Sequence, residues 1–194
     1  MAHGVCPTWV GYFLLNPLRM ILENPKRMFS GLITEGMTVL EPGCGMGFFT
    51  LQIARMVGPG GRVLAIDIQA KMLSTLRRRA ERAGLSERID TRLARADGLG
   101  LEELSGAVDL AVALHMVHEV PDQASFFVDI RRALKPEGRL LVVEPGGHVS
   151  SKQMEETLSK ALAAGFRIEK LLKDLLRRGA LLSKNCTDDR LKGA

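Results

Sequence analysis

Short apolar runs alternate with amphipathic stretches along the chain from residue 36 onward. The apolar runs, such as residues 110–114 and 140–143, are nearly continuous, which is typical of strands that are covered on both faces. In the stretches between them, apolar residues recur every three or four positions, which indicates helices. The alternation predicts an α/β fold built on a parallel sheet.

The pattern places strands near residues 37–41, 62–67, 89–94, 107–114 and 138–144. It places helices near residues 48–57, 69–84, 121–134 and 150–164. Ser150 and Gln153 have the spacing of a capping box at the start of the last helix. After Gly165 the residues alternate in polarity over 166–172, and residues 177–179 are expected to turn the chain into 180–183, which predicts a terminal β-hairpin.

Composition places the chain among ordinary globular proteins, because its 194 residues are 46% hydrophobic and 25% charged. No run approaches the ~20 apolar residues of a membrane span, and the amino terminus lacks the features of a signal peptide. Cys6, Cys44 and Cys186 are odd in number and far apart, which fits a reducing compartment. We therefore expect a cytoplasmic protein, and the sequence carries no signal for an oligomeric state.

The formal net charge of +5 raises the question of a nucleic-acid partner. The densest basic group is Arg77, Arg78 and Arg79 with Arg82. These arginines lie beside the apolar stripe of the helix expected at 69–84, so a solvated outer face is favoured over a binding patch. No nucleic-acid partner is predicted.

A glycine-rich turn follows the first expected strand. It contains Gly43, Gly45 and Gly47, with Cys44 and Met46 between them. Glycines at a strand's carboxyl end let the backbone approach a ligand closely. Glu41 at the strand tip would repel a pyrophosphate but suits a cationic ligand or one that carries hydroxyl and amine groups. Phe48 occupies the place of the last glycine in the dinucleotide fingerprint, which disfavours a nicotinamide cofactor.

A second acid, Asp67, closes the second expected strand. An acid at this place in a doubly wound sheet can accept hydrogen bonds from ribose hydroxyls. The structural alternative is a cap for the helix that opens near Gln69. Ile68 and Met72 follow Asp67 and lie near the same strand end.

Together these residues resemble the motifs of class I S-adenosylmethionine (SAM)-dependent methyltransferases. Glu41 and the three glycines match the family's first motif, Glu/Asp-x-Gly-x-Gly-x-Gly, and Asp67 matches its second acid. The chain is similar to the small-molecule type, which includes the ubiquinone- and menaquinone-biosynthesis methyltransferases, over about residues 36–184. The resemblance implies a doubly wound, Rossmann-like sheet of seven strands, mostly parallel with an antiparallel C-terminal hairpin and helices on both faces. It also implies an enzyme that moves a methyl group from SAM to a small-molecule acceptor.

The resemblance further assigns residues to the cofactor. It implies that Asp67 holds the ribose and that Asp97, in the pair Asp97-Gly98, meets the adenine amino group, although an Asp-Gly pair also forms simple turns. His115, at the tip of the fourth expected strand, would contact the methionine part. The implied SAM site consists of Glu41, Gly43, Cys44, Gly45, Gly47, Phe48, Asp67, Ile68, Met72, Asp97, Gly98 and His115.

Methyl transfer is an in-line displacement on a sulfonium, and an oxygen or carbon acceptor must also lose a proton. The groups that could remove this proton are His115, His118, Glu119 and Glu144. Of these, His115, His118 and Glu144 are the predicted catalytic residues. Histidine suits the task because its unperturbed pKa of about 6.5 leaves it partly basic at neutral pH. Positioning of the acceptor without a dedicated base is an equal alternative.

A metal site is a weaker possibility. All four histidines fall on segments expected to converge at the ligand edge, together with a cysteine and a carboxylate. The set is His3, His115, His118, His148, Cys6 and Glu144. Their spacing matches no metal signature, so no metal is predicted.

Two other functions stay open on sequence grounds. A protein or RNA methyltransferase is one, although residues 115–118 (His-Met-Val-His) replace the Asn/Asp-Pro-Pro-Tyr/Phe tetrad of enzymes that methylate amines. The other is a SAM-binding module without catalysis, since intact binding motifs cannot demonstrate turnover.

We expect residues 1–35, the segment before the first expected strand, to form a helical lid. Two short helices are expected on either side of Asn24-Pro25. Trp9, Tyr12 and Phe13 could line an acceptor pocket or pack as core beneath the sheet edge. Residues 36–184 then form the SAM-binding domain, and residues 185–194 form a polar tail.

Overall fold

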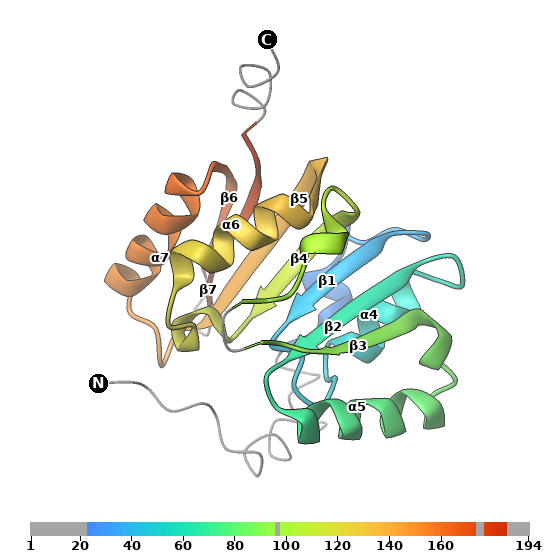
Figure 1. Ribbon diagram of the computed structural model, residues 1–194. Helices are drawn as coiled ribbons and strands as arrows, with labels where there is room; N and C mark the ends of the chain where they lie inside the picture. The colour runs from blue at the N-terminus through green and yellow to red at the C-terminus, as the bar shows by residue number, and fades with distance from the viewer. Residues whose placement is uncertain (1–22, 96–97, 174–176, 186–194) are drawn as a thin grey trace. The chain divides into compact units, whose positions relative to one another are not determined.

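The computed structural model describes residues 23–95, 98–173 and 177–185 (Figure 1). Its strands follow the order β3-β2-β1-β4-β5-β7-β6 in a seven-stranded sheet. This order confirms the α/β class and the mostly parallel sheet with an antiparallel C-terminal hairpin. The chain divides into two compact units, Met1–Leu99 and Gly100–Ala194, and each is described by itself.

The first unit contains three parallel strands and the helices that pack on them. Its elements are α3 (Pro25–Met28), β1 (Thr38–Pro42), α4 (Thr50–Met56), β2 (Arg62–Asp67), α5 (Ala70–Arg82), the 3-10 turn η1 (Ser86–Arg88) and β3 (Ile89–Leu93). Strand β2 pairs in parallel with both β1 and β3. Helix α4 packs against β2, and α5 packs against β2 and β3. Every residue of β2 except Arg62 is buried, which accounts for its apolar run.

The second unit contains one parallel strand pair and the terminal hairpin. Its elements are the 3-10 turns η2 (Glu102–Leu104) and η3 (Val117–Glu119), the helices α6 (Gln123–Ala133) and α7 (Ser151–Ala163), and the strands β4 (Val108–Leu114), β5 (Leu134–Pro145), β6 (Phe166–Lys173) and β7 (Arg177–Lys184). Strand β5 pairs in parallel with β4 and antiparallel with β7, which also pairs antiparallel with β6. Helices α6 and α7 lie side by side (Figure 1). The predicted capping box of Ser150 and Gln153 is present at the start of α7.

Three sequence-based boundaries are wrong. Residues 177–179 belong to β7 and do not form the turn, because Gly179 pairs with Val143 of β5 and a Cβ there would lie 2.5 Å from the Val142 carbonyl oxygen. Strand β5 already begins at Leu134, and the turn-type residues after it fall where the register against β4 shifts. Helix α4 begins at Thr50, two residues later than expected, because the glycine turn occupies the residues before it.

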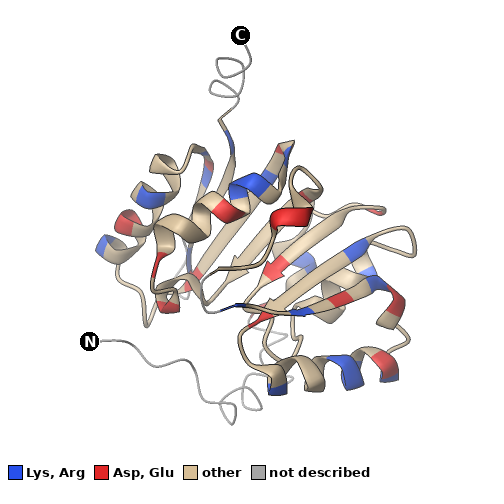
Figure 2. Cartoon of the chain, viewed as in Figure 1, with Lys and Arg blue, Asp and Glu red and all other residues tan. Residues whose placement is uncertain are grey.

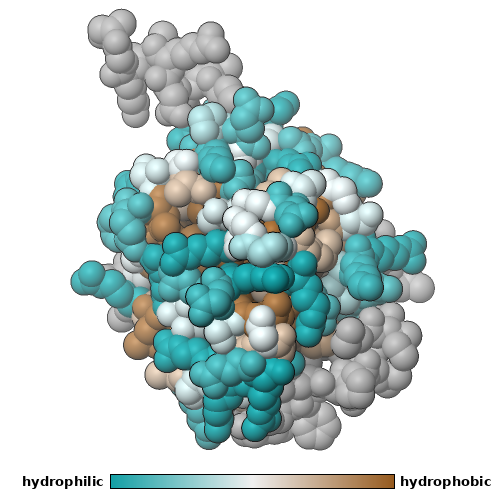
Figure 3. All heavy atoms as spheres, turned by 90° about the vertical axis from the view of Figure 1, so that its right-hand side faces the viewer, coloured by the Kyte–Doolittle hydropathy of each residue, from teal (hydrophilic) through white to brown (hydrophobic). Residues whose placement is uncertain are grey.

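The surface carries both charge signs. Figure 2 shows basic positions along α5 and acidic positions at several strand and helix ends. In the view of Figure 3, hydrophilic side chains cover most of the visible face, with smaller apolar areas between them. Within the part of the chain that the structure describes, no helix is long and apolar enough to cross a membrane.

Candidate active site

The glycine turn after β1 has the backbone geometry that its sequence predicts. Gly43, Gly45 and Gly47 have φ angles of 70°, 54° and 81°, in the left-handed region that glycine adopts most readily. The Cys44 N–H donates to the Ile66 carbonyl of β2 at 3.0 Å, which ties the turn to the neighbouring strand. Alternate glycines are therefore required here by the path of the chain.

Two of these glycines also differ in what surrounds them. A Cβ at Gly47 would lie 2.2 Å from Cδ1 of Leu76 on α5, so a larger residue would force the Leu76 side chain to shift. A Cβ at Gly45 would meet no atom within 4 Å. The turn is thus closely packed at Gly47 and open at Gly45, as a backbone that receives a ligand requires.

Asp67 closes β2 and holds the turn. Its Oδ2 accepts a hydrogen bond from the Gly45 N–H at 2.8 Å, and its Oδ1 accepts one from the Gln69 N–H at 2.8 Å. Burial raises the pKa of the Asp67 carboxyl, and the backbone N–H groups of Gln69, Gly45 and Ile68 partly oppose this rise. A carboxylate offers about four lone-pair sites, so Asp67 keeps acceptor capacity for a ligand. Asp67 supports the start of α5 and can still accept hydrogen bonds from ribose hydroxyls. The two roles considered from the sequence, helix cap and ribose acceptor, are therefore compatible.

Glu41 lies near the end of β1 and is only 3% exposed. Burial raises the pKa of its carboxyl group from 4.5 to about 8, while the neighbouring Thr50 hydroxyl lowers it and the charge of Asp67 raises it further. Within the described residues, neither Glu41 Oε2 nor the buried Thr50 Oγ1 makes a hydrogen bond of good geometry. Buried polar atoms are normally satisfied, so this pair is suited to a polar ligand group. The sequence did not single out Thr50.

The other expected cofactor residues of the first unit vary in exposure. Cys44 is buried, and burial raises the pKa of its thiol well above the usual value, as do the charges of Glu41 and Asp67, so this thiol stays protonated. Met72 is buried, whereas Ile68 is 55% exposed and offers apolar surface beside Asp67. Phe48 is half-buried and stacks edge to face on Phe49, with centroids 4.8 Å apart.

The Asp97-Gly98 pair lies only partly within the described residues. The Arg95 N–H donates to the Gly98 carbonyl at 3.1 Å, in an isolated antiparallel bridge between these two residues. Asp97 lies outside the described residues, and its expected contact with adenine stays a prediction.

In the second unit, His115 follows β4 directly and has a φ angle of 59°. Its N–H donates to the Val143 carbonyl of β5 at 2.7 Å. A non-glycine residue in the left-handed region is uncommon and occurs most often in turns and at functional sites. The strand tip therefore turns sharply at the residue that the sequence assigned to cofactor or acceptor contact.

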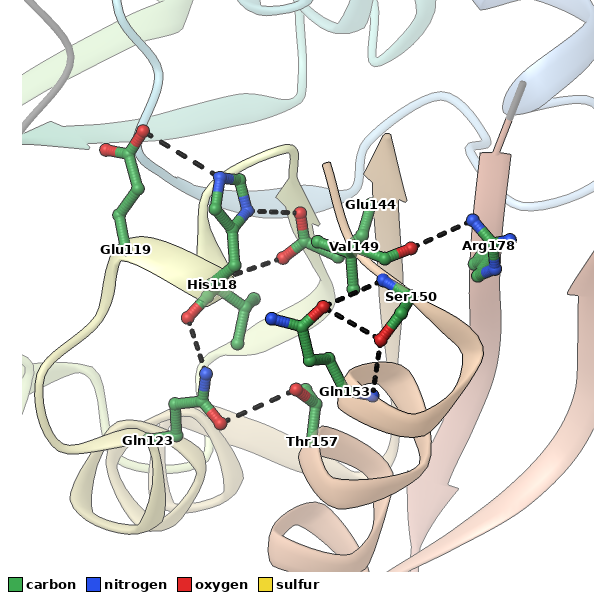
Figure 4. A network of polar contacts seen from close by, with 10 residues as sticks. His118, Glu119, Gln123, Glu144, Val149, Ser150, Gln153, Thr157 and Arg178 are labelled. Atoms are coloured by element: carbon green, nitrogen blue, oxygen red, sulfur yellow. Dashed lines mark hydrogen bonds and ion pairs between the residues drawn. The ribbon is translucent and has the colours of Figure 1, made fainter. Parts of the chain in front are cut away.

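His118 and Glu144 form a hydrogen-bonded pair, shown in Figure 4. His118 Nδ1 lies 2.8 Å from Glu144 Oε2, and the His118 N–H donates to Glu144 Oε1 at 3.1 Å. The Glu144 side chain is 1% exposed and that of His118 is 30% exposed. The hydrogen bond to Glu144 raises the pKa of His118, burial opposes this, and the charges of Glu144 and Glu119 add to the rise. The sequence predicted both residues but not their contact.

The loop that carries His118 is fixed from α6. Gln123 Nε2 donates to the Val117 carbonyl at 2.8 Å, and Gln123 Oε1 accepts from Lys160 Nζ of α7 at 2.9 Å. Arg178 of β7 donates to the carbonyls of Gly146 and Val149, in the loop after β5 (Figure 4 shows the second contact). These bonds hold η3 and the end of β5 in place, so the histidine is oriented before any ligand arrives.

Such a pair can act as a general base. When Nδ1 of a neutral histidine donates to a carboxylate, Nε2 is left as an acceptor for a proton. His118 Nε2 lies 3.9 Å from Glu119 Oε1, which is exposed to a similar extent. In acyl-transfer enzymes a carboxylate orients the catalytic histidine in the same way.

The remaining candidates are not brought together. Among the described residues, no group of three or more histidine, cysteine or acidic side chains could hold a metal ion. His148 is exposed on the loop before α7. His3, Cys6 and the aromatic residues Trp9, Tyr12 and Phe13 lie outside the described residues, so the lid stays a prediction.

Comparison with known proteins shows the family of the chain. Residues 33–186 match the family model described as a methyltransferase domain. The chain is 33% identical over 132 residues to a ubiquinone/menaquinone biosynthesis C-methyltransferase, UbiE, of Enterobacter sp. (strain 638), which covers 68% of this chain and 50% of the relative. The chain spans about half the length of the quinone-pathway methyltransferases that it matches.

Solved structures share the fold. A SAM-dependent methyltransferase from Aquifex aeolicus has a TM-score of 0.82 at 23% identity, covering 92% of this chain and 98% of that one. A [4+2]-cyclase, SpnF, has a TM-score of 0.64 at 25% identity, covering 78% and 59%. The fold thus serves more than one reaction, and function must be argued from the site. Because the family model spans residues 33–186, the chain belongs to the methyltransferase domain family.

Proposed function

We propose that this protein transfers a methyl group from SAM to a small-molecule acceptor. The observation that carries the proposal is the orphaned Oε2 of Glu41, buried next to a glycine turn that is open at Gly45 and held by Asp67. Membership of the methyltransferase family supports the same reaction.

The residues present fit SAM. Its ammonium and hydroxyl groups are donors, and the first unit offers the unsatisfied Oε2 of Glu41 and spare lone pairs at Asp67. Ile68, exposed beside Asp67, offers an apolar surface to the adenine ring. When bound, SAM supplies an electrophilic methyl group on a sulfonium. Glu41 and Asp67 would hold it, and the glycine turn would let the backbone approach closely.

The second unit supplies the groups for the acceptor. His118, whose ring is oriented by Glu144, would act as the base that takes a proton from a hydroxyl or an activated carbon of the acceptor. This favours an acceptor that must lose a proton, such as a phenol or a hydroquinone. The named activities of two relatives, C-methylation in ubiquinone/menaquinone biosynthesis and O-methylation in ubiquinone biosynthesis, point to the same class.

A binding titration tests the cofactor assignment. We expect the wild type to bind S-adenosylhomocysteine (SAH), and Asp67→Ala to bind it roughly 10- to 100-fold more weakly, because one or two hydrogen bonds to a charged acceptor are worth about 1 to 3 kcal/mol each. Asp90→Ala is the matched control, since Asp90 lies on the edge strand β3 and forms ion pairs with Arg62 of β2 and Arg92 of β3. Equal SAH affinity in wild type and Asp67→Ala would refute the ribose role.

A further inference from the structure

One arginine of α5 does not lie on the solvated face. Arg77, Arg78 and Arg82 are exposed, whereas Arg79 is half-buried. Its Nη1 donates to the carbonyl of Met46, in the middle of the glycine turn. The basic cluster that Figure 2 shows along α5 therefore contains one residue with an inward contact.

Helix α5 contacts the glycine turn through two side chains, those of Leu76 and Arg79. Leu76 fills the space beside Gly47, where a Cβ would clash with it. Arg79 follows Leu76 by three residues, so both side chains lie on the same side of the helix. The apolar contact sets how close the helix comes, and the arginine then bonds the backbone of the turn.

The turn is also held from its other side. Asp67 accepts from the Gly45 N–H, and Arg79 donates to the carbonyl of the next residue, Met46. An acidic and a basic side chain thus form hydrogen bonds with the backbone of two consecutive residues of the turn. Burial lowers the pKa of the Arg79 guanidinium, and the charge of Arg55 adds to this. The cost of partly burying the guanidinium charge offsets its one hydrogen bond to a backbone carbonyl. This contact by itself therefore contributes little to the free energy of unfolding.

We propose that Arg79 is a positioning residue for the cofactor, which fixes the glycine turn in the conformation that binds SAM. The inference rests on the proposed function. Without this bond the turn samples other conformations, and only a fraction of molecules is ready to bind, which lowers the apparent affinity by that fraction. The chemistry itself does not involve Arg79.

The test compares Arg79→Met, which keeps the apolar stem but removes the donors, with Arg79→Lys, which keeps one donor group. We expect Arg79→Met to bind SAH about tenfold more weakly, with KM for SAM raised and kcat at saturating SAM unchanged. Arg79→Lys should recover part of the affinity, and amide exchange of residues 45–48 should be faster in SAH-free Arg79→Met than in wild type. Arg82→Met, exposed in the last turn of the same helix, is the control and should match wild type.

The outcomes separate this inference from the proposed function. SAH affinity of Arg79→Met within twofold of a wild type that binds SAH overturns the positioning role of Arg79 alone. A wild type that does not bind SAH overturns the proposed function and the positioning role with it. If Arg79→Met does not fold, as judged by circular dichroism, Arg79→Ala, which also removes the donors, is judged by the same criterion.

Discussion

Glu41 is an acid that folding withdraws from water. Its pKa rises from 4.5 to about 8, with burial as the main cause. Between these pH values the folded protein binds a proton that the unfolded chain has released. Stability in the absence of ligand therefore falls as pH rises through this window, and it levels off above the folded pKa.

The substitution Glu41→Gln tests this at the residue scale. Glutamine has a similar shape and no charge, so the variant should lose the pH dependence that Glu41 causes. We expect its melting temperature without ligand to match that of wild type near pH 5 and to exceed it by roughly 10 °C above pH 8. Scanning calorimetry across this range provides the measurement, with Glu81→Gln on the exposed side of α5 as control. Parallel profiles for wild type and Glu41→Gln would show that the carboxyl group is not buried in this way.

His118 changes stability with pH in the same direction as Glu41. Its pKa is raised in the folded state, so the stability from its contact with Glu144 is present below pH 6.5 and is lost as pH rises through the folded pKa. As a general base, however, His118 must be neutral. Methyl transfer should therefore increase with pH through that same raised pKa.

Glu144→Gln separates these effects. Removing the charge lowers the pKa of His118 and disturbs its tautomer, so the acidic limb of kcat/KM should move to lower pH while the rate falls by about 10²-fold. A pH–rate profile of wild type and variant measures both, and His148→Ala, exposed on the loop before α7, serves as a histidine control. An acidic limb that stays in place in Glu144→Gln would contradict the role of the pair.

At the scale of elements, the turn between β1 and α4 depends on how α5 packs. Gly47 has both a positive φ and the close contact with Leu76, whereas Gly45 has a positive φ and open space. The two glycines are thus required for different reasons. Gly45 is required by its positive φ angle alone. Gly47 is required by its positive φ angle and by the close contact with Leu76 of α5.

Alanine at these positions should show the difference. We expect Gly45→Ala to lower the free energy of unfolding by about 1 kcal/mol through strain alone, and Gly47→Ala by about 3 kcal/mol, because overpacking adds to strain. In a double-mutant cycle, Gly47→Ala with Leu76→Ala should cost less than the sum of the single changes. Urea titration gives these values, and equal costs for the two glycines would argue against the close packing of α5.

The elements themselves were largely predictable from sequence, since periodicity and turn residues report local physics. The errors came where distant partners decide. Arg178 and Gly179 resemble turn residues, yet they are strand residues because β5 pairs with them. Arg79 was grouped with its exposed neighbours, although its spacing of seven from Met72 and three from Leu76 puts it on their side of the helix.

At the scale of the whole molecule, the motifs gave the family, the fold and most candidate residues, but not their contacts. The pairs that organise the site, Gly45 with Asp67 and His118 with Glu144, are 22 and 26 residues apart in sequence. No local signal links such positions, and neither the proton on Glu41 nor the strained backbone at His115 follows from residue type. The proposed function assigns cofactor binding to the first unit and proton removal to the second.

The most direct measurement is transfer of a labelled methyl group from SAM by the wild-type protein, offered phenol and hydroquinone acceptors. The account predicts label in the acceptor with one SAH released for each methyl group transferred, and a sharp loss of both in His118→Ala. If the protein binds SAH tightly but labels none of these acceptors, methyl transfer to phenols or hydroquinones is contradicted. The result would instead favour a protein that binds SAM without catalysis.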